Sequence, residues 1–320
     1  MTDLVDLAWI IITQLGEDRF YLAVLVIVYL GIERKLGVKV ATYAMTSVWI
    51  NSFLKDLLMI PRPPPQNWKI QVEGYGFPSG HAQGVTVIMG YLASKVRSHL
   101  AYSVAASLVL LVSCSRLALV VHSVYDVVGG VLIGLAILVI GWFVESKVSP
   151  KMLKDQGRLA WLALPIVSAI LSSVIGIGGD DSFRAAGALF GLLVGYMILE
   201  EKRTKEPGSV IERITNVVVG LIVAVSLYYS VGEIVSGALP VFLALAATGF
   251  LASVVPAVTT VLFRQSGGVA TRGIERQPRP VTETAVQMWS FSSGPKTGTG
   301  LEIRPFSAPT ASPKVGRSVS

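Results

Sequence analysis

Three short segments combine cationic, hydroxyl and imidazole side chains in a pattern suited to phosphoryl chemistry. They read Lys-x6-Arg-Pro over residues 55–63, Pro-Ser-Gly-His over 78–81, and Ser-Arg-x5-His-x3-Asp over 115–126. Arginine offers bidentate hydrogen bonds to a phosphate, and lysine a mobile point charge. Three cations near an apolar phase are costly unless an anion lies between them. We therefore expect one oxyanion site, formed by Lys55, Arg62, Ser79, His81, Arg116, His122 and Asp126.

The two histidines in these segments are suited to different tasks. His122 and Asp126 are four residues apart, the spacing of neighbours on one helical face. A carboxylate bonded to one imidazole nitrogen fixes the tautomer and leaves the other nitrogen free to attack phosphorus. His81 is then the candidate general acid for the departing oxygen, and later the base for water. The predicted reaction is hydrolysis in two steps through a phospho-histidine.

The Ser79-Gly80-His81 segment is predicted to begin a helix, whose free N–H groups and positive dipole end bind anions. Pro78 suits such a start, and Gly80 lets the backbone approach a ligand closely. Neither a metal nor another cofactor is expected, because the sequence has no Asp, Glu and His cluster with metal-ligand spacing. The cations can instead neutralise the charge that develops on phosphorus.

The elements that must position these residues are long and apolar. Of the 320 residues, 52% are hydrophobic and 15% charged, whereas soluble domains have about 25% charged residues. The apolar residues form blocks of roughly 17–25, enough to span a bilayer as helices. Residues 4–14 are predicted to form a helix at the interface, and 57–78 a Pro-rich loop. The predicted spans are 20–32, 37–56, 79–95, 100–117, 122–144, 159–177, 184–199, 214–231 and 237–262.

Charge placement predicts the orientation of these spans. If they alternate, all but six of the 27 lysines and arginines fall on one side, which the positive-inside rule makes cytoplasmic. The six on the outer side are Arg19, Lys55, Arg62, Lys69, Arg116 and Arg184. The N-terminus and the site are then outside and the C-terminus is cytoplasmic. This topology accounts for the net charge of +7 without a nucleic-acid partner.

Two further features of the apolar blocks lead to predictions about packing. Cys114 is the single cysteine, so an intramolecular disulfide is excluded, and we interpret it as a buried inert thiol. Gly129, Gly130 and Gly134 are interpreted as helix-packing positions.

The three motifs together resemble the type 2 phosphatidic acid phosphatases (the PAP2 or lipid phosphate phosphatase superfamily), which include glucose-6-phosphatase and are similar to vanadium haloperoxidases. The matching segments are KDLLMIPRP, PSGH and SRLALVVHSVYD, within residues 20–145. The resemblance implies that His122 is the nucleophile, His81 the general acid and Asp126 the partner of His122. It also implies that the phosphoryl oxygens are bound by Lys55, Arg62, Ser79, Gly80 and Arg116.

The motifs also differ from those of many relatives, which have an aromatic residue soon after Ser-Arg and Tyr-Pro after the nucleophile. Here the segments read LALVV and HSVYD. GYGFPSGHA and the HSxxD form resemble the sphingosine-phosphate-phosphatase branch more closely. The chemistry is unaffected by these differences, but the lipid is left open.

The predicted fold is an all-α multi-pass membrane bundle in a plasma membrane. Residues 1–145 form the core, completed to six helices by 159–177, and residues 178–263 add about three spans. Residues 264–320 are a disordered cytoplasmic tail.

The predicted function is hydrolysis of a membrane lipid phosphate or polyprenyl pyrophosphate, with the bilayer as the partner and the oligomeric state undetermined. Three alternatives stay open. They are a lipid phosphotransferase, a glucose-6-phosphatase-like enzyme for a soluble ester, and a non-catalytic transporter or scaffold.

Overall fold

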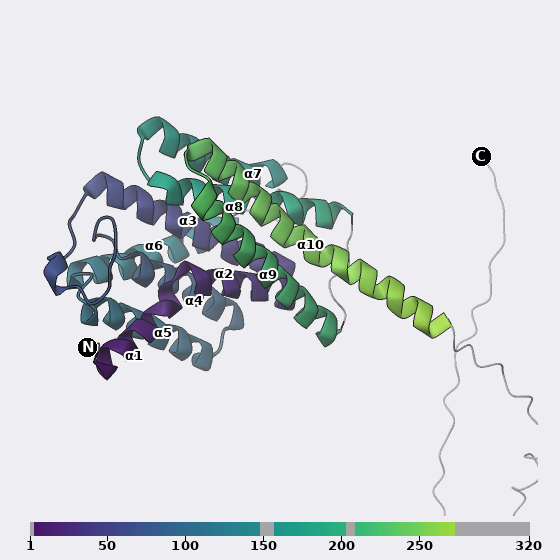
Figure 1. Ribbon diagram of the computed structural model, residues 1–320, viewed down its shortest axis with the longest axis horizontal. Helices are drawn as coiled ribbons and strands as arrows, with labels where there is room; N and C mark the ends of the chain where they lie inside the picture. The colour runs from purple at the N-terminus through teal and green to yellow at the C-terminus, as the bar shows by residue number, and fades with distance from the viewer. Residues whose placement is uncertain (1–2, 148–156, 203–208, 273–320) are drawn as a thin grey trace, which may run out of the picture. The chain divides into compact units, whose positions relative to one another are not determined.

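The computed structural model describes residues 3–147, 157–202 and 209–272, which are helical and contain no strand (Figure 1). Each of the nine predicted blocks corresponds to a helix, and residues 4–14 form one as well. The helices are α1 (Leu4–Thr13), α2 (Asp18–Val26), α3 (Arg34–Leu58), α4 (Gly80–Val96), α5 (His99–Ala118), α6 (Val124–Lys147), α7 (Gly157–Ile175), α8 (Gly179–Glu201), α9 (Val210–Ile234) and α10 (Ala238–Arg272). A 3₁₀ turn (Gln14–Gly16) follows α1, and a π-helical segment (Ile27–Ile32) follows α2.

Several boundaries differ from the prediction by a few residues, and two of these differences matter for the site and the tail. The helix α6 begins at Val124, so His122 precedes it. The helix α10 continues to Arg272, past the predicted start of the tail at residue 264, and residues 273–320 lie outside the described residues. The helix α3 ends where the Pro-rich loop was predicted to begin. Its C-cap Met59 has the left-handed φ of 48°, and the prolines of the next segment cannot continue a helix.

The helices α3, α5 and α6 pack around α4. Glycines make the contact of α6 with α4 close. A Cβ added at Gly130 would lie 2.5 Å from the Ser79 carbonyl oxygen, and one at Gly134 would lie 3.0 Å from that of Gln83. Gly129 faces the ring of Phe77 equally closely. The predicted packing role of these glycines is confirmed.

The helices α8, α9 and α10 form a second layer of packing. The helix α10 contacts both α8 and α9, and α8 packs against α3 and α7. Gly187 and Gly191 of α8 face the α10 backbone with no room for a side chain. Hydrogen bonds also join this layer to α2 and α3. Tyr228 donates to Asp18 Oδ2 (3.2 Å), and the Gly178 N–H donates to Asp56 Oδ2 (2.8 Å).

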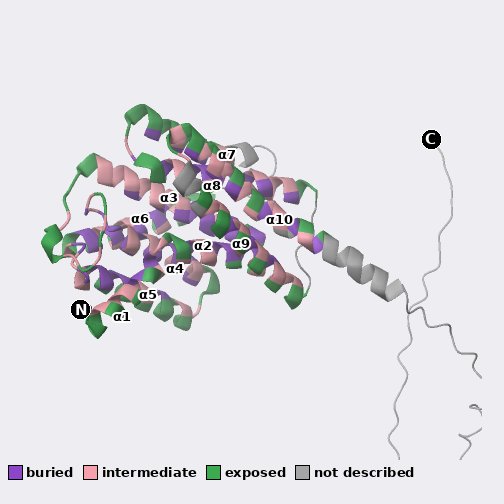
Figure 2. Cartoon of the chain, in the orientation of Figure 1, coloured by how far each residue is buried: buried purple, intermediate pink, exposed green. Residues whose placement is uncertain are grey.

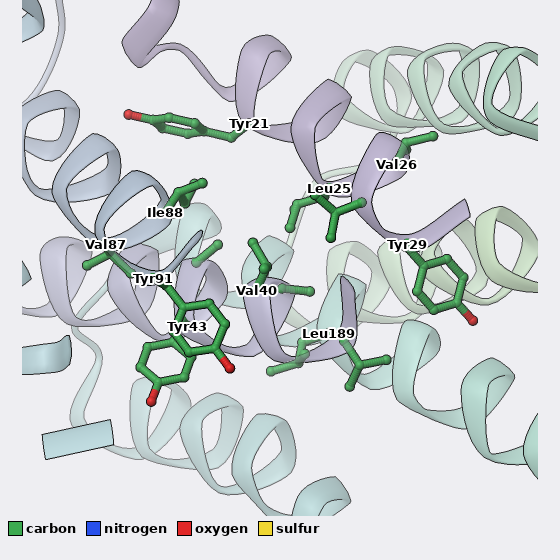
Figure 3. Packing of buried hydrophobic residues seen from close by; sticks show 14 of the residues in the cluster. Tyr21, Leu25, Val26, Tyr29, Val40, Tyr43, Val87, Ile88, Tyr91 and Leu189 are labelled. Carbon is green, nitrogen blue, oxygen red and sulfur yellow. The ribbon is translucent and has the colours of Figure 1, made fainter. Parts of the chain in front are cut away.

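Buried apolar side chains pack between the early helices and the second layer (Figure 3). Tyr21 and Leu25 of α2, Val40 of α3 and Ile88 of α4 belong to one cluster with Leu189 of α8. The core therefore reaches from the α2–α4 region into α8.

The outer faces are apolar too, which identifies the chain as a multi-pass membrane protein. Within the described residues, five helical stretches are long and apolar enough to cross a membrane: His99–Ala118, Val124–Lys147, Gly179–Glu201, Val210–Tyr228 and Ala238–Val261. Large side chains such as Leu132 and Trp142 of α6 are exposed, and lipid is the solvent that such a surface favours. Figure 2 shows exposed residues in green along the helices. Cys114 is exposed on α5, so the prediction of a buried thiol was wrong.

Candidate active site

The predicted site residues gather at one end of α3–α6. Lys55 lies in the last turn of α3, and Ser79 and His81 lie at the start of α4. Arg116 lies in the last turn of α5, and His122 and Asp126 lie at the start of α6. At the opposite end, Glu145 accepts from Lys39 (3.0 Å), Tyr91 (2.9 Å) and Lys95 (3.2 Å).

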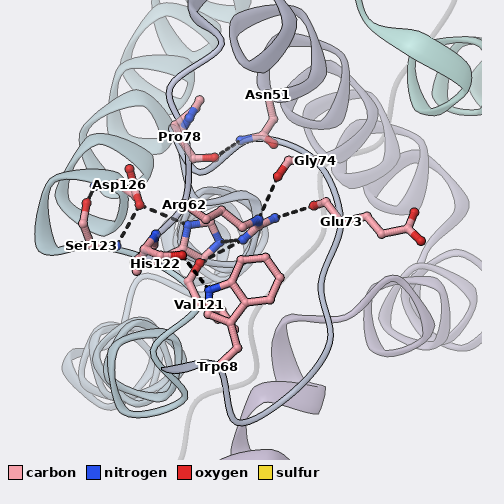
Figure 4. Close-up of polar contacts among 11 residues, drawn as sticks. Asn51, Arg62, Trp68, Glu73, Gly74, Pro78, Val121, His122, Ser123 and Asp126 are labelled. Carbon is pink, nitrogen blue, oxygen red and sulfur yellow. Dashed lines mark hydrogen bonds and ion pairs between the residues drawn. The ribbon is translucent and has the colours of Figure 1, made fainter. Parts of the chain in front are cut away.

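The guanidinium of Arg62 is held by backbone carbonyls and reaches His122 (Figure 4). Its Nε donates to Gly74 O (3.0 Å), Nη2 to Glu73 O (2.8 Å) and Nη1 to Val121 O (3.1 Å). Nη1 also lies 2.9 Å from His122 Nε2. An arginine only donates, so His122 Nε2 accepts here, and the ring proton of the neutral imidazole is on Nδ1.

Asp126 lies beside Nδ1 of His122, with its Oδ2 3.4 Å away (Figure 4). The two residues do not share a helical face, because His122 precedes α6. Ser123 is the residue before the helix, and its N–H donates to Asp126 Oδ2 (2.7 Å), while its Oγ accepts from the Asp126 N–H (3.2 Å). This reciprocal pair is a capping box, and it turns the carboxylate back toward His122.

Ser79 is the residue before α4, yet its hydroxyl does not cap the helix. Its N–H donates to Asp126 O (2.9 Å), which joins the two helix starts. Its Oγ is fully buried and has no partner among the described residues. Buried polar groups are normally paired, so this hydroxyl is suited to bind an oxyanion together with the free N–H groups of the first turn of α4.

Asn51 fixes the start of α4 from the side of α3. It donates to Pro78 O (3.2 Å) and to Gln83 Oε1 (2.9 Å), and a Cβ on Gly80 would lie 3.0 Å from its Oδ1. Gln83 in turn donates to the carbonyl oxygen of Ser47 (2.9 Å). The buried network therefore holds Gly80 and its backbone N–H in place.

Two side chains from the first 17 residues contact the predicted site residues Arg116 and His81. Thr13 Oγ1 accepts from Arg116 Nη1 (2.7 Å), and both residues are buried, while Arg116 Nε has no partner within the described residues. Glu17 Oε1 lies 3.1 Å from His81 Nε2. Sequence reasoning missed Thr13, Glu17, Asn51 and Ser123. Asn51 stood out only as a polar residue within an apolar helix, and the Ser-x-x-Asp spacing was the available signal for Ser123.

Burial and neighbouring charges set the electrostatics of the two groups that lie outside the helices. Burial lowers the pKa of His122 to about 4, against the opposing effect of Asp126, and the charges of Arg62, Arg116 and Lys55 act in the same direction as burial. The hydrogen bond from His81 lowers the pKa of Glu17. His122 is therefore neutral, as a nucleophile must be, and Glu17 is ionised. Within the described residues, no group of three His, Cys, Asp or Glu side chains could hold a metal ion.

Two segments of the chain match models of one known protein family. Residues 36–149 match the PAP2 superfamily model, and residues 183–267 match the model of the PAP2 superfamily phosphatase transmembrane extension. The chain therefore belongs to the PAP2 superfamily. The second layer, α8–α10, contains the segment matched as the transmembrane extension, and we call α8–α10 the extension. Thr13 and Glu17 lie outside both matches.

Individual relatives match only part of the chain. Human sphingosine-1-phosphate phosphatase 2 is 32% identical over 39% of this chain, and the lipid phosphate phosphatase delta of Arabidopsis thaliana is 28% identical over 45%. The chain spans 34% and 40% of the length of these relatives. The crystal structure of a transmembrane PAP2 type phosphatidylglycerolphosphate phosphatase from Bacillus subtilis is 26% identical, covering 47% of this chain and 81% of that chain. The TM-score of that comparison is 0.43.

Proposed function

We propose that this chain is a membrane phosphatase that hydrolyses a lipid phosphate through a phospho-histidine on His122. The observation that carries the proposal is the neutral His122, whose Nδ1 faces Asp126 and whose Nε2 faces the Arg62 guanidinium. That nitrogen carries the lone pair, and the cation beside it is suited to hold a phosphoryl group in line for attack.

In the first step Nε2 of His122 forms a bond to phosphorus as the bond from phosphorus to the leaving oxygen breaks. Arg62 transfers its hydrogen bond from Nε2 to a phosphoryl oxygen, so the lone pair becomes free. Lys55, Arg116, the Ser79 hydroxyl and the Gly80 N–H stabilise the other oxygens. His81 gives its proton to the leaving alkoxide, and Asp126 stabilises the imidazole as it gains charge.

In the second step water attacks phosphorus, and the bond from phosphorus to Nε2 breaks. His81 now accepts the proton from water, and the products are an alcohol and inorganic phosphate. The Glu17 carboxylate is hydrogen-bonded to Nε2 of His81 and so orients the ring. The other ring nitrogen, Nδ1, is then the one that faces the leaving oxygen.

We further propose that the site is on the extracytoplasmic side. The support is the distribution of charge, since the described helix ends opposite the site carry Lys35, Lys39, Lys95, Arg97 and Lys147.

The test uses the purified full chain and a panel of phosphatidate, sphingoid-base phosphates, polyprenyl pyrophosphate and glucose 6-phosphate. Release of free phosphate from a lipid supports the proposal, whereas phosphate found on an acceptor alcohol supports a phosphotransferase. The covalent step is tested with a radiolabelled aryl phosphate, whose leaving group needs no protonation. His81→Ala should then accumulate an acid-labile, alkali-stable label that His122→Ala lacks, and label retained in His122→Ala would refute the intermediate.

A further inference from the structure

A cavity of about 360 Å³ lies between the early helices and the extension. Its polar end is lined by Glu17, Lys55 and His81. Of the two proposed catalytic histidines, His81 lines the cavity, whereas the described lining does not include His122. In the proposed mechanism His81 protonates the leaving oxygen, so the cavity begins on the side of phosphorus from which the alcohol departs.

From this polar end the cavity follows one face of α3. The lining residues of that helix recur every three or four positions, through Asn51, Val48, Ala44 and Ala41 to Gly37. The distance from Lys55 to Gly37 is roughly 27 Å at 1.5 Å per helical residue, close to the ~30 Å thickness of the hydrocarbon core. Leu25 and Val26 line the same space from α2. The walls beyond the polar end are therefore mostly apolar.

The extension forms the far wall. Its lining residues are largely small or aliphatic, among them Ala188 and Leu192 of α8, Ala224 of α9, and Leu245 and Ala252 of α10. These helices are held over the α3 face by the contact between α3 and α8 and by the bond of Tyr228 to Asp18. The small side chains leave room for a ligand beside α3.

We propose that this cavity binds the hydrocarbon chain of the leaving alcohol and that the extension selects single-chain lipid monophosphates. The inference rests on the proposed function, since it assigns the leaving-group side through His81. A volume of about 360 Å³ along this length of α3 makes the cavity narrow, which favours one hydrocarbon chain over two. Polar residues of the same lining, among them Asp18 and Asp181, then face the polar atoms next to the phosphate.

The test fills the cavity from the extension and varies the chain. Ala252→Leu adds bulk to the lining of α10, and Ala247→Leu is the matched control, because Ala247 is exposed on the same helix. Butyl, octyl and hexadecyl phosphate are compared with two-chain phosphatidate in lipid nanodiscs. We expect kcat/KM of the wild type to rise with chain length. Ala252→Leu should lower it about tenfold for hexadecyl phosphate, as for the loss of about two buried methylenes, and hardly at all for butyl phosphate.

An equal loss for every chain length, a loss of the same size in Ala247→Leu, or a preference of the wild type for phosphatidate would overturn the inference. Ala188→Leu on α8 is a second variant, in case Ala252→Leu does not fold. Binding of radiolabelled hexadecyl phosphate is measured as well, because it needs no turnover. If the wild type hydrolyses neither these substrates nor any lipid of the panel described above, the proposed function fails. Binding that is lost in Ala252→Leu and kept in Ala247→Leu would then still support the cavity, and equal binding would refute it.

Discussion

Glu17 Oε1 lies 3.1 Å from Nε2 of His81, although the two residues are 64 positions apart in the chain. The carboxylate belongs to the connection between α1 and α2, whereas the imidazole is in the first turn of α4. A carboxylate in this position orients the ring and stabilises its protonated form. The proposed general acid is therefore supported by a residue outside the two segments that match the family.

Replacing Glu17 by glutamine should lower kcat by about 10- to 100-fold with little change in KM, because His81 would lose its orientation and the charge that stabilises its proton. For the same reason the basic limb of the pH profile should move to lower pH. Steady-state kinetics across pH measures both effects. Glu33→Gln at the start of α3 is the control, and an unchanged pH profile in Glu17→Gln would rule out the positioning role.

Thr13 is predicted to hold Arg116 in place through its 2.7 Å hydrogen bond. Thr13→Val keeps the shape of the side chain but leaves a buried guanidinium donor unpaired. We expect about a tenfold fall in kcat/KM, within the range for a lost hydrogen bond to a charged group. Thr13→Ser keeps the hydroxyl and should retain most activity. Equal activity of the valine and serine variants would contradict this role.

The pH dependence of the proposed nucleophile follows from its burial, which lowers the pKa of His122 to about 4. A histidine with a lowered pKa is neutral above that value, so His122 should stay unprotonated down to mildly acidic pH and gain its proton only near pH 4. The chain has three histidines, so NMR of histidine-labelled protein can follow the His122 signal, assigned with His122→Ala. A midpoint near the ordinary value of about 6.5 would disagree with the burial of this ring.

Ser123 should matter for stability more than for chemistry. Ser123→Ala removes the hydroxyl that accepts from the Asp126 N–H, which costs about 0.5–2 kcal/mol for a helix cap. It keeps the backbone N–H that holds Asp126 Oδ2. Thermal unfolding should therefore show a lower Tm, while activity changes only a few-fold. Asp126→Asn should reduce kcat by orders of magnitude, as expected when the partner of a catalytic histidine loses its charge. Similar activity losses in the two variants would argue against this separation of roles.

The sidedness of the site is tested with cysteines introduced into a Cys114→Ser background. Asn67→Cys lies in the exposed loop after α3, and Val96→Cys lies at the opposite end of the bundle. In intact cells a membrane-impermeant maleimide should label the first variant and reach the second only after permeabilisation. The reverse pattern would place the site on the cytoplasmic side.

The sequence by itself determined the helices and the chemistry available at their ends. Long apolar blocks in a lipid solvent must satisfy their own backbone bonds, so each of the nine predicted blocks became a helix. Helix order then placed the three motifs at one end of the bundle. The packing role of Gly130 and Gly134 could be predicted as well, because close helix contacts require small residues.

Only the tertiary structure decided which distant groups support these motifs. The partnership of Glu17 with His81 and of Thr13 with Arg116 depends on how the α1–α2 connection lies against α4 and α5, and no local periodicity encodes that contact. The same holds for His122 and Asp126, whose approach comes from the Ser123 cap and not from a shared helical face. Short-range propensities set the elements, whereas the partners of the candidate site and the cavity beside His81 arise from packing between helices far apart in the chain.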